Sequence, residues 1–203
     1  MRTKTKALAL ALCAVLLVVT TVFVTMAYLT SEDSVTNTFT VGKVTITLDE
    51  AKVDEYGEEE EGASRVNANT YKLIPGHTYT KDPQIHVDTN SEDCYLFVKI
   101  ENGLGTDGTI NGLEGNGWEA VANQPGIYCY YGIDAEGALN GDKKIVKANE
   151  DIDVFDTFTF GEKADPSNYD TAAKNAKIIV TAYAIQADGL SEKTPAEIWA
   201  LFK

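Results

Sequence analysis

The sequence has few of the residues that mark catalytic and metal sites. Of its 203 residues only two are histidines, His77 and His86, and only three are cysteines. It lacks an HExxH motif, and a catalytic zinc site takes three protein ligands with an open fourth position. Two histidines nine residues apart would need a carboxylate beside them, and no Ser–His–acid or Cys–His arrangement can be picked out by spacing. We therefore expect no enzyme, with no catalytic residues, no metal ligands and no cofactor.

Positive charge is also scarce. The chain has 17 lysines and arginines against 31 aspartates and glutamates, and three of the basic residues (Arg2, Lys4 and Lys6) precede the first apolar run. Without residues 1–27 the chain keeps 14 basic and 31 acidic residues, a net charge of −17. Because so acidic a surface repels nucleic acid and anionic lipid, we expect neither as a partner.

One long apolar run is present, at residues 7–27, and it follows the basic start. It has no charge over twenty-one residues and is followed by a polar segment, which is typical of an export signal. Thr25 and Ala27 supply modest or small residues three positions and one position before a cut. We therefore predict cleavage by a signal peptidase between Ala27 and Tyr28.

The same residues allow two alternatives to a cleaved signal. Twenty-one residues in a helix would span a bilayer core of ~30 Å as an uncleaved anchor. Threonines weaken the last third of the run, however, and no basic cluster follows it. The thiol of Cys13 suggests a lipoprotein, but Leu12 stands where a small residue would be needed. We expect a secreted or cell-surface protein that meets the membrane only through the uncleaved signal.

The mature chain is short enough for one domain. We predict a signal peptide at 1–27 and a single domain at 28–203. Within that domain we expect an N-terminal strand and hinge at 28–42, an acidic loop at 49–69 and a C-terminal helix at 194–203.

Cys94 and Cys129 are the cysteines left in the mature chain. Outside the membrane a disulfide is permitted but not required. If the two pair, the closed loop would stabilise the fold by roughly 4 kcal/mol in the chain-entropy model. Both residues lie in apolar, strand-like stretches, so two buried free thiols are the alternative, and the sequence leaves both open.

Alternation with a period of two runs through most of the mature chain and predicts β-strands. The first alternation, at 35–41, changes phase at Gly42 before a second one at 44–48, which suggests a hinge between two strands. The strongest strand pattern is at 94–101. Further strands are expected at 71–74, 85–87, 118–121, 127–131, 145–146, 154–160 and 177–186.

The chain ends in a helix signature. Thr194 and Glu197 form a capping box with proline at the first helical position. Eight or nine strands with turns between them and little helix predict an all-β protein. We expect an antiparallel β-sandwich with this short helix docked on a sheet edge or end.

Three stretches carry weaker signals. Residues 49–61 hold eight carboxylates against one lysine, which predicts a solvated, mobile loop rather than a calcium site. Residues 103–108 spell GxGxxG, but no helical pattern follows, so we expect a glycine loop and no dinucleotide site. The tyrosines Tyr128, Tyr130 and Tyr131 suggest either a binding platform or amphipathic sheet residues.

Several segments, in order along the chain, resemble the TasA/camelysin family of surface and biofilm-matrix proteins of Gram-positive bacteria. Residues 26–30 (MAYLT) and 37–42 (NTFTVG) resemble the start of proteins exported through the SipW-type signal peptidase. Residues 73–76 with 80–82 resemble the L-x-P-G…T-K-D segment of the family. The strands at 95–100 and 182–187 resemble two of its later strands.

The resemblance implies a jelly-roll-like sandwich whose freed N-terminus adds a strand to a neighbouring subunit and builds fibres. An extended strand can pair its backbone with an open sheet edge, and a head-to-tail contact of that kind does not close. Val35, Phe39 and Val41 would be the apolar contacts of the donated strand, and the partner would be itself or a related subunit. We therefore expect a fibre-capable structural protein of the extracellular matrix or cell surface.

Two other functions remain open. The family also implies a metalloprotease, because camelysin is described as one, but the histidine pattern does not support transferring that activity to this chain. A monomeric adhesin or ligand-binding module would use the tyrosine cluster or the glycine loop. Both an adhesin and a fibre subunit need a stable sandwich with exposed loops, so the sequence does not separate them.

Overall fold

The computed structural model describes residues 12, 14–16, 43–169 and 177–202. The chain divides into two compact units, Met1–Thr40 and Val41–Lys203. In the first unit Leu12 and residues 14–16 are helical. The predicted cleavage site and the predicted strand at 35–41 lie outside the described residues.

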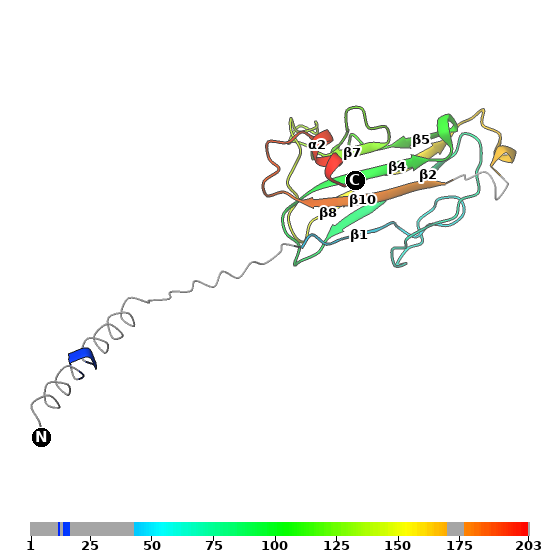
Figure 1. Ribbon diagram of the computed structural model, residues 1–203. Coiled ribbons are helices and arrows are strands. Elements are labelled where there is room, and N and C mark those ends of the chain that lie inside the picture. Colours follow the sequence, from blue (N-terminus) through cyan, green and yellow to red (C-terminus); the bar gives the residue numbers. More distant parts are fainter. Residues whose placement is uncertain (1–11, 13, 17–42, 170–176, 203) are drawn as a thin grey trace, which may run out of the picture. The chain divides into compact units, whose positions relative to one another are not determined.

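The described part of the second unit is mostly β-structure, in three antiparallel sheets (Figure 1). The first sheet has the order β1 (Ile46–Asp49), β3 (Gln84–Val87) and β8 (Asp151–Asp153). The second has the order β10 (Ile178–Gln186), β4 (Cys94–Asn102), β7 (Ile127–Tyr130) and β6 (Trp118–Ala120). The third has the order β2 (Thr78–Thr80), β9 (Thr157–Phe160) and β5 (Gly108–Asn111). The prediction of an antiparallel all-β protein is confirmed at this level.

The first and third sheets continue into one another. β2 runs on into β3 and β8 into β9, and backbone hydrogen bonds bridge both connections. The Lys81 amide donates to the Asp156 carbonyl at 3.0 Å, and the Val154 amide donates to the Pro83 carbonyl at 2.8 Å. Asp156 in turn donates its amide to the carbonyl of Asn111 at 3.0 Å.

The main core lies between the first and second sheets. β4 directs Cys94, Leu96, Val98 and Ile100 to this side, where they pack with residues of β3 and β8 such as Ile85 and Ile152. The alternation of β4 therefore has the predicted core face. A smaller core of Tyr79, Leu104, Phe158, Phe160 and Ala164 lies under the third sheet.

The opposite face of β4 is covered by the C-terminal helix. Tyr95 and Phe97 on that face pack with Ile198 and Trp199 of α2 (Pro195–Trp199), which continues as η3 (Ala200–Phe202). The predicted capping box is present: the Thr194 amide donates to Glu197 Oε2 at 2.8 Å, and Thr194 Oγ1 accepts from the Glu197 amide at 3.3 Å. The helix thus docks on a sheet face, where an edge or end position was expected.

Several strand boundaries were wrong. Residues 71–74 are not a strand, because Tyr71 instead packs its ring edge-on against Tyr79 and Phe158. Residues 145–146 contribute only an isolated bridge between Val146 and Cys94. The stretch 154–160 is a strand only from Thr157 onward.

Short strands without an apolar run were missed. β8 has the sequence Asp-Ile-Asp, with only Ile152 buried. β5 begins at Gly108 inside the predicted glycine loop, after the 3₁₀ turn η1 (Gly105–Asp107). The chain therefore leaves the GxGxxG motif as a strand and not as the helix that a pyrophosphate site needs.

The acidic segment is not the uniformly solvated loop that was expected. Glu58, Glu59, Glu60 and Glu61 are exposed, but Glu50 is 4% exposed and Val53 is 7% exposed. Residue 50 bridges Val66 through two backbone hydrogen bonds of 2.7 and 2.8 Å. The start of the acidic segment can pack because cationic side chains from elsewhere in the fold pair with its carboxylates: Arg65 with Asp49 and Lys81 with Glu50.

The two cysteines are free and buried, on opposite faces of the second sheet. Cys94 belongs to the core against β3 and β8, whereas Cys129 belongs to the core under α2. Cys129 is paired in register with Phe97, three residues along β4 from Cys94. A disulfide needs side chains that point toward each other with Cα atoms closer than about 7 Å, so this fold favours the free thiols.

We expect the mature protein, residues 28–203, to resist thiol alkylation when native and to take up two alkyl groups without reductant when unfolded. Burial raises the pKa of Cys94 to about 11 and that of Cys129 to about 12, so little thiolate is present near neutral pH. Intact mass after alkylation in denaturant, with no reductant at any step, is the measurement. Absence of uptake would mean that the two thiols are paired.

Candidate functional site

β10 is the edge strand of the second sheet. All nine of its residues pair with β4, from Ile178 opposite Asn102 to Gln186 opposite Cys94. Among the described residues no strand pairs with its other side. β10 thus presents a long row of free backbone donors and acceptors, which natural sheets seldom leave open.

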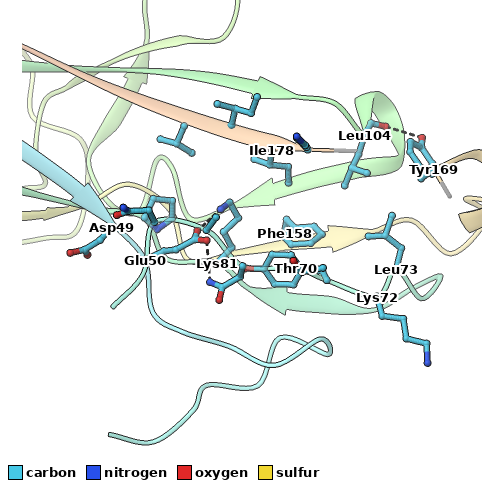
Figure 2. A pocket seen from close by; sticks show the side chains of 18 of the residues that line it. Asp49, Glu50, Thr70, Lys72, Leu73, Lys81, Leu104, Phe158, Tyr169 and Ile178 are labelled. Atoms are coloured by element: carbon cyan, nitrogen blue, oxygen red, sulfur yellow. Dashed lines mark hydrogen bonds and ion pairs between the residues drawn. The ribbon is translucent and has the colours of Figure 1, made fainter. Parts of the chain in front are cut away.

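A groove of about 950 Å³ runs beside this edge (Figure 2). One wall is residues 177–180, at the start of β10, and the other is residues 67–73. Apolar side chains line much of it: Leu48, Leu73, Leu104, Phe158, Ile178, Ile179 and Val180. Ile179 is 46% exposed, so the edge offers an apolar surface as well as backbone groups.

The other end of the groove is polar and tightly bonded. There Asn69 and Lys81 both contact the carboxylate of Glu50, and Asp49 lies beside Glu50 (Figure 2). Arg65 holds Asp49 and Asp82 together at this end: its Nε contacts Asp49 Oδ1 at 2.5 Å and its Nη1 contacts Asp82 Oδ2 at 3.0 Å. The groove therefore has an apolar part that is open to a ligand and a polar end that the protein fills itself.

His86 adjoins this polar end from β3. Its Nε2 lies 3.0 Å from Asp49 Oδ1 and its Nδ1 lies 2.7 Å from Asp151 Oδ1. Only the charged imidazolium can donate from both nitrogens. Burial opposes that charge, but the hydrogen bonds to the two carboxylates outweigh it and raise the pKa of His86. Burial likewise acts against ionised Asp49, yet its bonds with Arg65 and His86 leave its pKa lowered.

The structure separates the other residues that the sequence singled out. His77 lies directly before β2, and its Nε2 is 2.8 Å from the Tyr56 carbonyl oxygen. It therefore does not share a site with His86. Within residues 43–169 and 177–202, no group of three or more His, Cys, Asp or Glu side chains is placed to hold a metal ion. No helix in the described part of the chain has the length and apolarity to cross a membrane.

The tyrosine cluster is not a single exposed platform. Tyr128 and Tyr130 face the main core, where Tyr130 packs on Trp118 with ring centroids 5.2 Å apart. Tyr131 packs on the other side, in the core under α2.

The groove beside β10 was missed, because its walls are far apart in the sequence. The pattern at 177–186 predicted a strand but not its place at the edge of a sheet.

The His86 contacts predict a pH-dependent contribution to stability. Since the folded-state pKa of His86 is raised above 6.5, its contribution is fully present below pH 6.5 and is lost as the pH rises through the folded value. Since the pKa of Asp49 is lowered below 3.8, its contribution is lost as the pH falls below that value. The stability advantage of the wild type over His86→Gln should be largest between these two limits.

Urea midpoints of the wild type and His86→Gln across pH measure this advantage, with His77→Gln as the matched control. A difference that stays constant or grows above pH 6.5 would contradict the assignment of the charged form.

A scan against protein-family models found no match, and a search of curated proteins found none either. Membership of the TasA/camelysin family is therefore a proposal.

Proposed function

We propose that the chain is a secreted or cell-surface structural protein whose subunits assemble into fibres by N-terminal strand donation. The single observation that carries this is the nine-residue edge of β10, paired on one side among the described residues and bordered by an apolar groove. In this proposal the domain is a jelly-roll-like sandwich of the TasA/camelysin type. Signal peptidase would free the donor by cutting between Ala27 and Tyr28.

The donor would be residues 35–41 of a second copy, with Val35, Phe39 and Val41 as its apolar contacts. The segment carries no charge, so it can approach a chain of strongly negative net charge without electrostatic repulsion. Its backbone would pair with the open side of β10 and its apolar side chains would enter the groove. One subunit then gives a strand and receives another, so the contact propagates.

A ligand-binding module is the second candidate, because the groove also has the size of a small-molecule site and combines apolar walls with a polar end. It would take an elongated ligand along β10 and leave the protein monomeric. The two candidates use the same groove and differ in its occupant. A metalloprotease has no such observation in its favour.

Deletion of residues 28–41 should leave a folded monomer that forms no filaments, because the donor is lost while the sheets remain. Negative-stain microscopy over a rising concentration series, with circular dichroism as a check on folding, compares it with residues 28–203. Filaments formed by the deletion variant would refute donation by this segment.

A second variant tests β10 as the edge that accepts the donated strand. Ile179→Lys places a charge on the open edge of β10, a device by which sheets block added strands, and should abolish filaments. The matched control is Ile133→Lys, because Ile133 is 47% exposed, close to the 46% of Ile179, but does not line the groove. Filaments from Ile179→Lys as abundant as those from the control would mean that β10 is not the acceptor.

A further inference from the structure

Three side chains that are distant in sequence meet at the polar end of the groove. Glu50 follows β1, Asn69 lies in the segment after it, and Lys81 lies between β2 and β3. One carboxylate joins the other two groups: Glu50 Oε1 accepts from Asn69 Nδ2 at 3.0 Å, and Glu50 Oε2 accepts from Lys81 Nζ (Figure 2). An amine, a carboxamide and a carboxylate therefore share one small site.

Two of the three side chains are largely closed to water, and that of Asn69 is half-buried. The side chain of Glu50 is 6% exposed and that of Lys81 is 11% exposed. The segment that carries Asn69 is held nearby through Tyr71, whose hydroxyl donates to the Thr80 carbonyl at 3.0 Å. Attack on a carbonyl carbon needs Lys81 Nζ without its extra proton, and the carboxylate of Glu50, which contacts Nζ, is the group placed to take that proton.

The carboxamide of Asn69 is held in one orientation. Its Nδ2 also donates to the Ala51 carbonyl at 2.7 Å, and its Oδ1 accepts from the Val53 amide at 3.1 Å. A backbone amide that donates to a carbonyl oxygen stabilises the negative charge that develops there when the carbon is attacked. The Asn69 carboxamide thus has its carbonyl oxygen on the Val53 amide and its nitrogen on Glu50.

We propose that Lys81 and Asn69 form an intramolecular amide cross-link, with Glu50 as the proton carrier. Nζ of Lys81 attacks Cγ of Asn69, the Nζ–Cγ bond forms, and the Cγ–Nδ2 bond breaks. The leaving group is ammonia, and nothing is oxidised or reduced.

The protons balance through Glu50. It takes one proton from the Lys81 ammonium before the attack and passes it to Nδ2 as that nitrogen leaves. It then takes the second proton from the attacking nitrogen and gives it to the departing ammonia, which leaves as ammonium. The carboxylate is restored, and the new amide keeps one hydrogen on Nζ.

Such a bond would close residues 69–81 into a covalent loop beside the groove. It would tie the segment at 67–73, one wall of the groove, to the junction of β2 and β3. That wall would then stay in place when the chain is pulled or partly unfolded. The inference does not depend on fibre formation, since it concerns one chain only.

The test is the intact mass of purified mature protein, residues 28–203, in denaturant. We expect a mass lower than the sequence mass by one ammonia, and a tryptic peptide pair in which residues 66–72 are linked to the peptide that contains Lys81. Glu50→Gln, Lys81→Arg and Asn69→Ala should each show the full mass for their sequence. Lys52→Arg is the matched control, because the Lys52 ammonium pairs with Glu60 on the exposed side of the same segment, and it should keep the lower mass.

A wild-type mass equal to the sequence mass would overturn the proposal and leave Glu50 and Lys81 as an ordinary buried ion pair. Loss of ammonia that persists in Lys81→Arg would also overturn it, since the ammonia would then come from deamidation or another site. Where a variant folds poorly, the linked peptide in the wild type still decides.

Discussion

The burial of β4 on both faces is the constraint on which the rest of the structure depends. Five consecutive residues, 94–98, are almost completely shielded from water. One face needs the sheet that contains β3 and β8, and the other needs α2. Truncating a fully buried residue such as Leu96 to alanine would cost about 2–5 kcal/mol. The C-terminal helix is thus part of the core, although it comes last in the chain.

This arrangement also explains why β10 is available as an edge. β4 is central and pairs with β7 on one side and β10 on the other. β10 is stabilised by its pairing with β4 and by the packing of its side chains in the two cores. The backbone groups on its outer side contribute to neither interaction. A strand held so firmly on one side can accept another on the free side without rearranging the fold, which is the physical basis of the proposed assembly.

Electrostatics shape the groove in a way that net charge alone does not indicate. The chain is strongly acidic, yet two of its cations lie beside carboxylates that folding removes from water: Lys81 pairs with buried Glu50, and Arg65 lies between half-buried Asp49 and Asp82. These contacts convert the start of the acidic segment into the polar end of the groove. The exposed glutamates at 58–61 keep the solvated character that the composition predicts.

The sequence predicted the elements whose patterns are local. The strands β4, β6, β7 and β10 follow from alternation, and the capping box of α2 follows from residues within one turn. β2, β5 and β8 were missed because three or four residues with one or two apolar side chains carry too little pattern, and their pairing is set by partners far along the chain. The Glu50–Asn69–Lys81 site could not be predicted, since its members are up to 31 residues apart and meet only after the sheets form.

The edge position of β10 could not be predicted either, because it depends on which strands pair across the whole chain. The most direct test of the account is amide hydrogen exchange across residues 178–186 in mature protein, first as a dilute monomer and then after concentration into assemblies. The account predicts that amides on the β4 side are protected in both states, and that the others become protected only on assembly. Equal exchange of these amides in both states, with assemblies present, would show that β10 is not where subunits join.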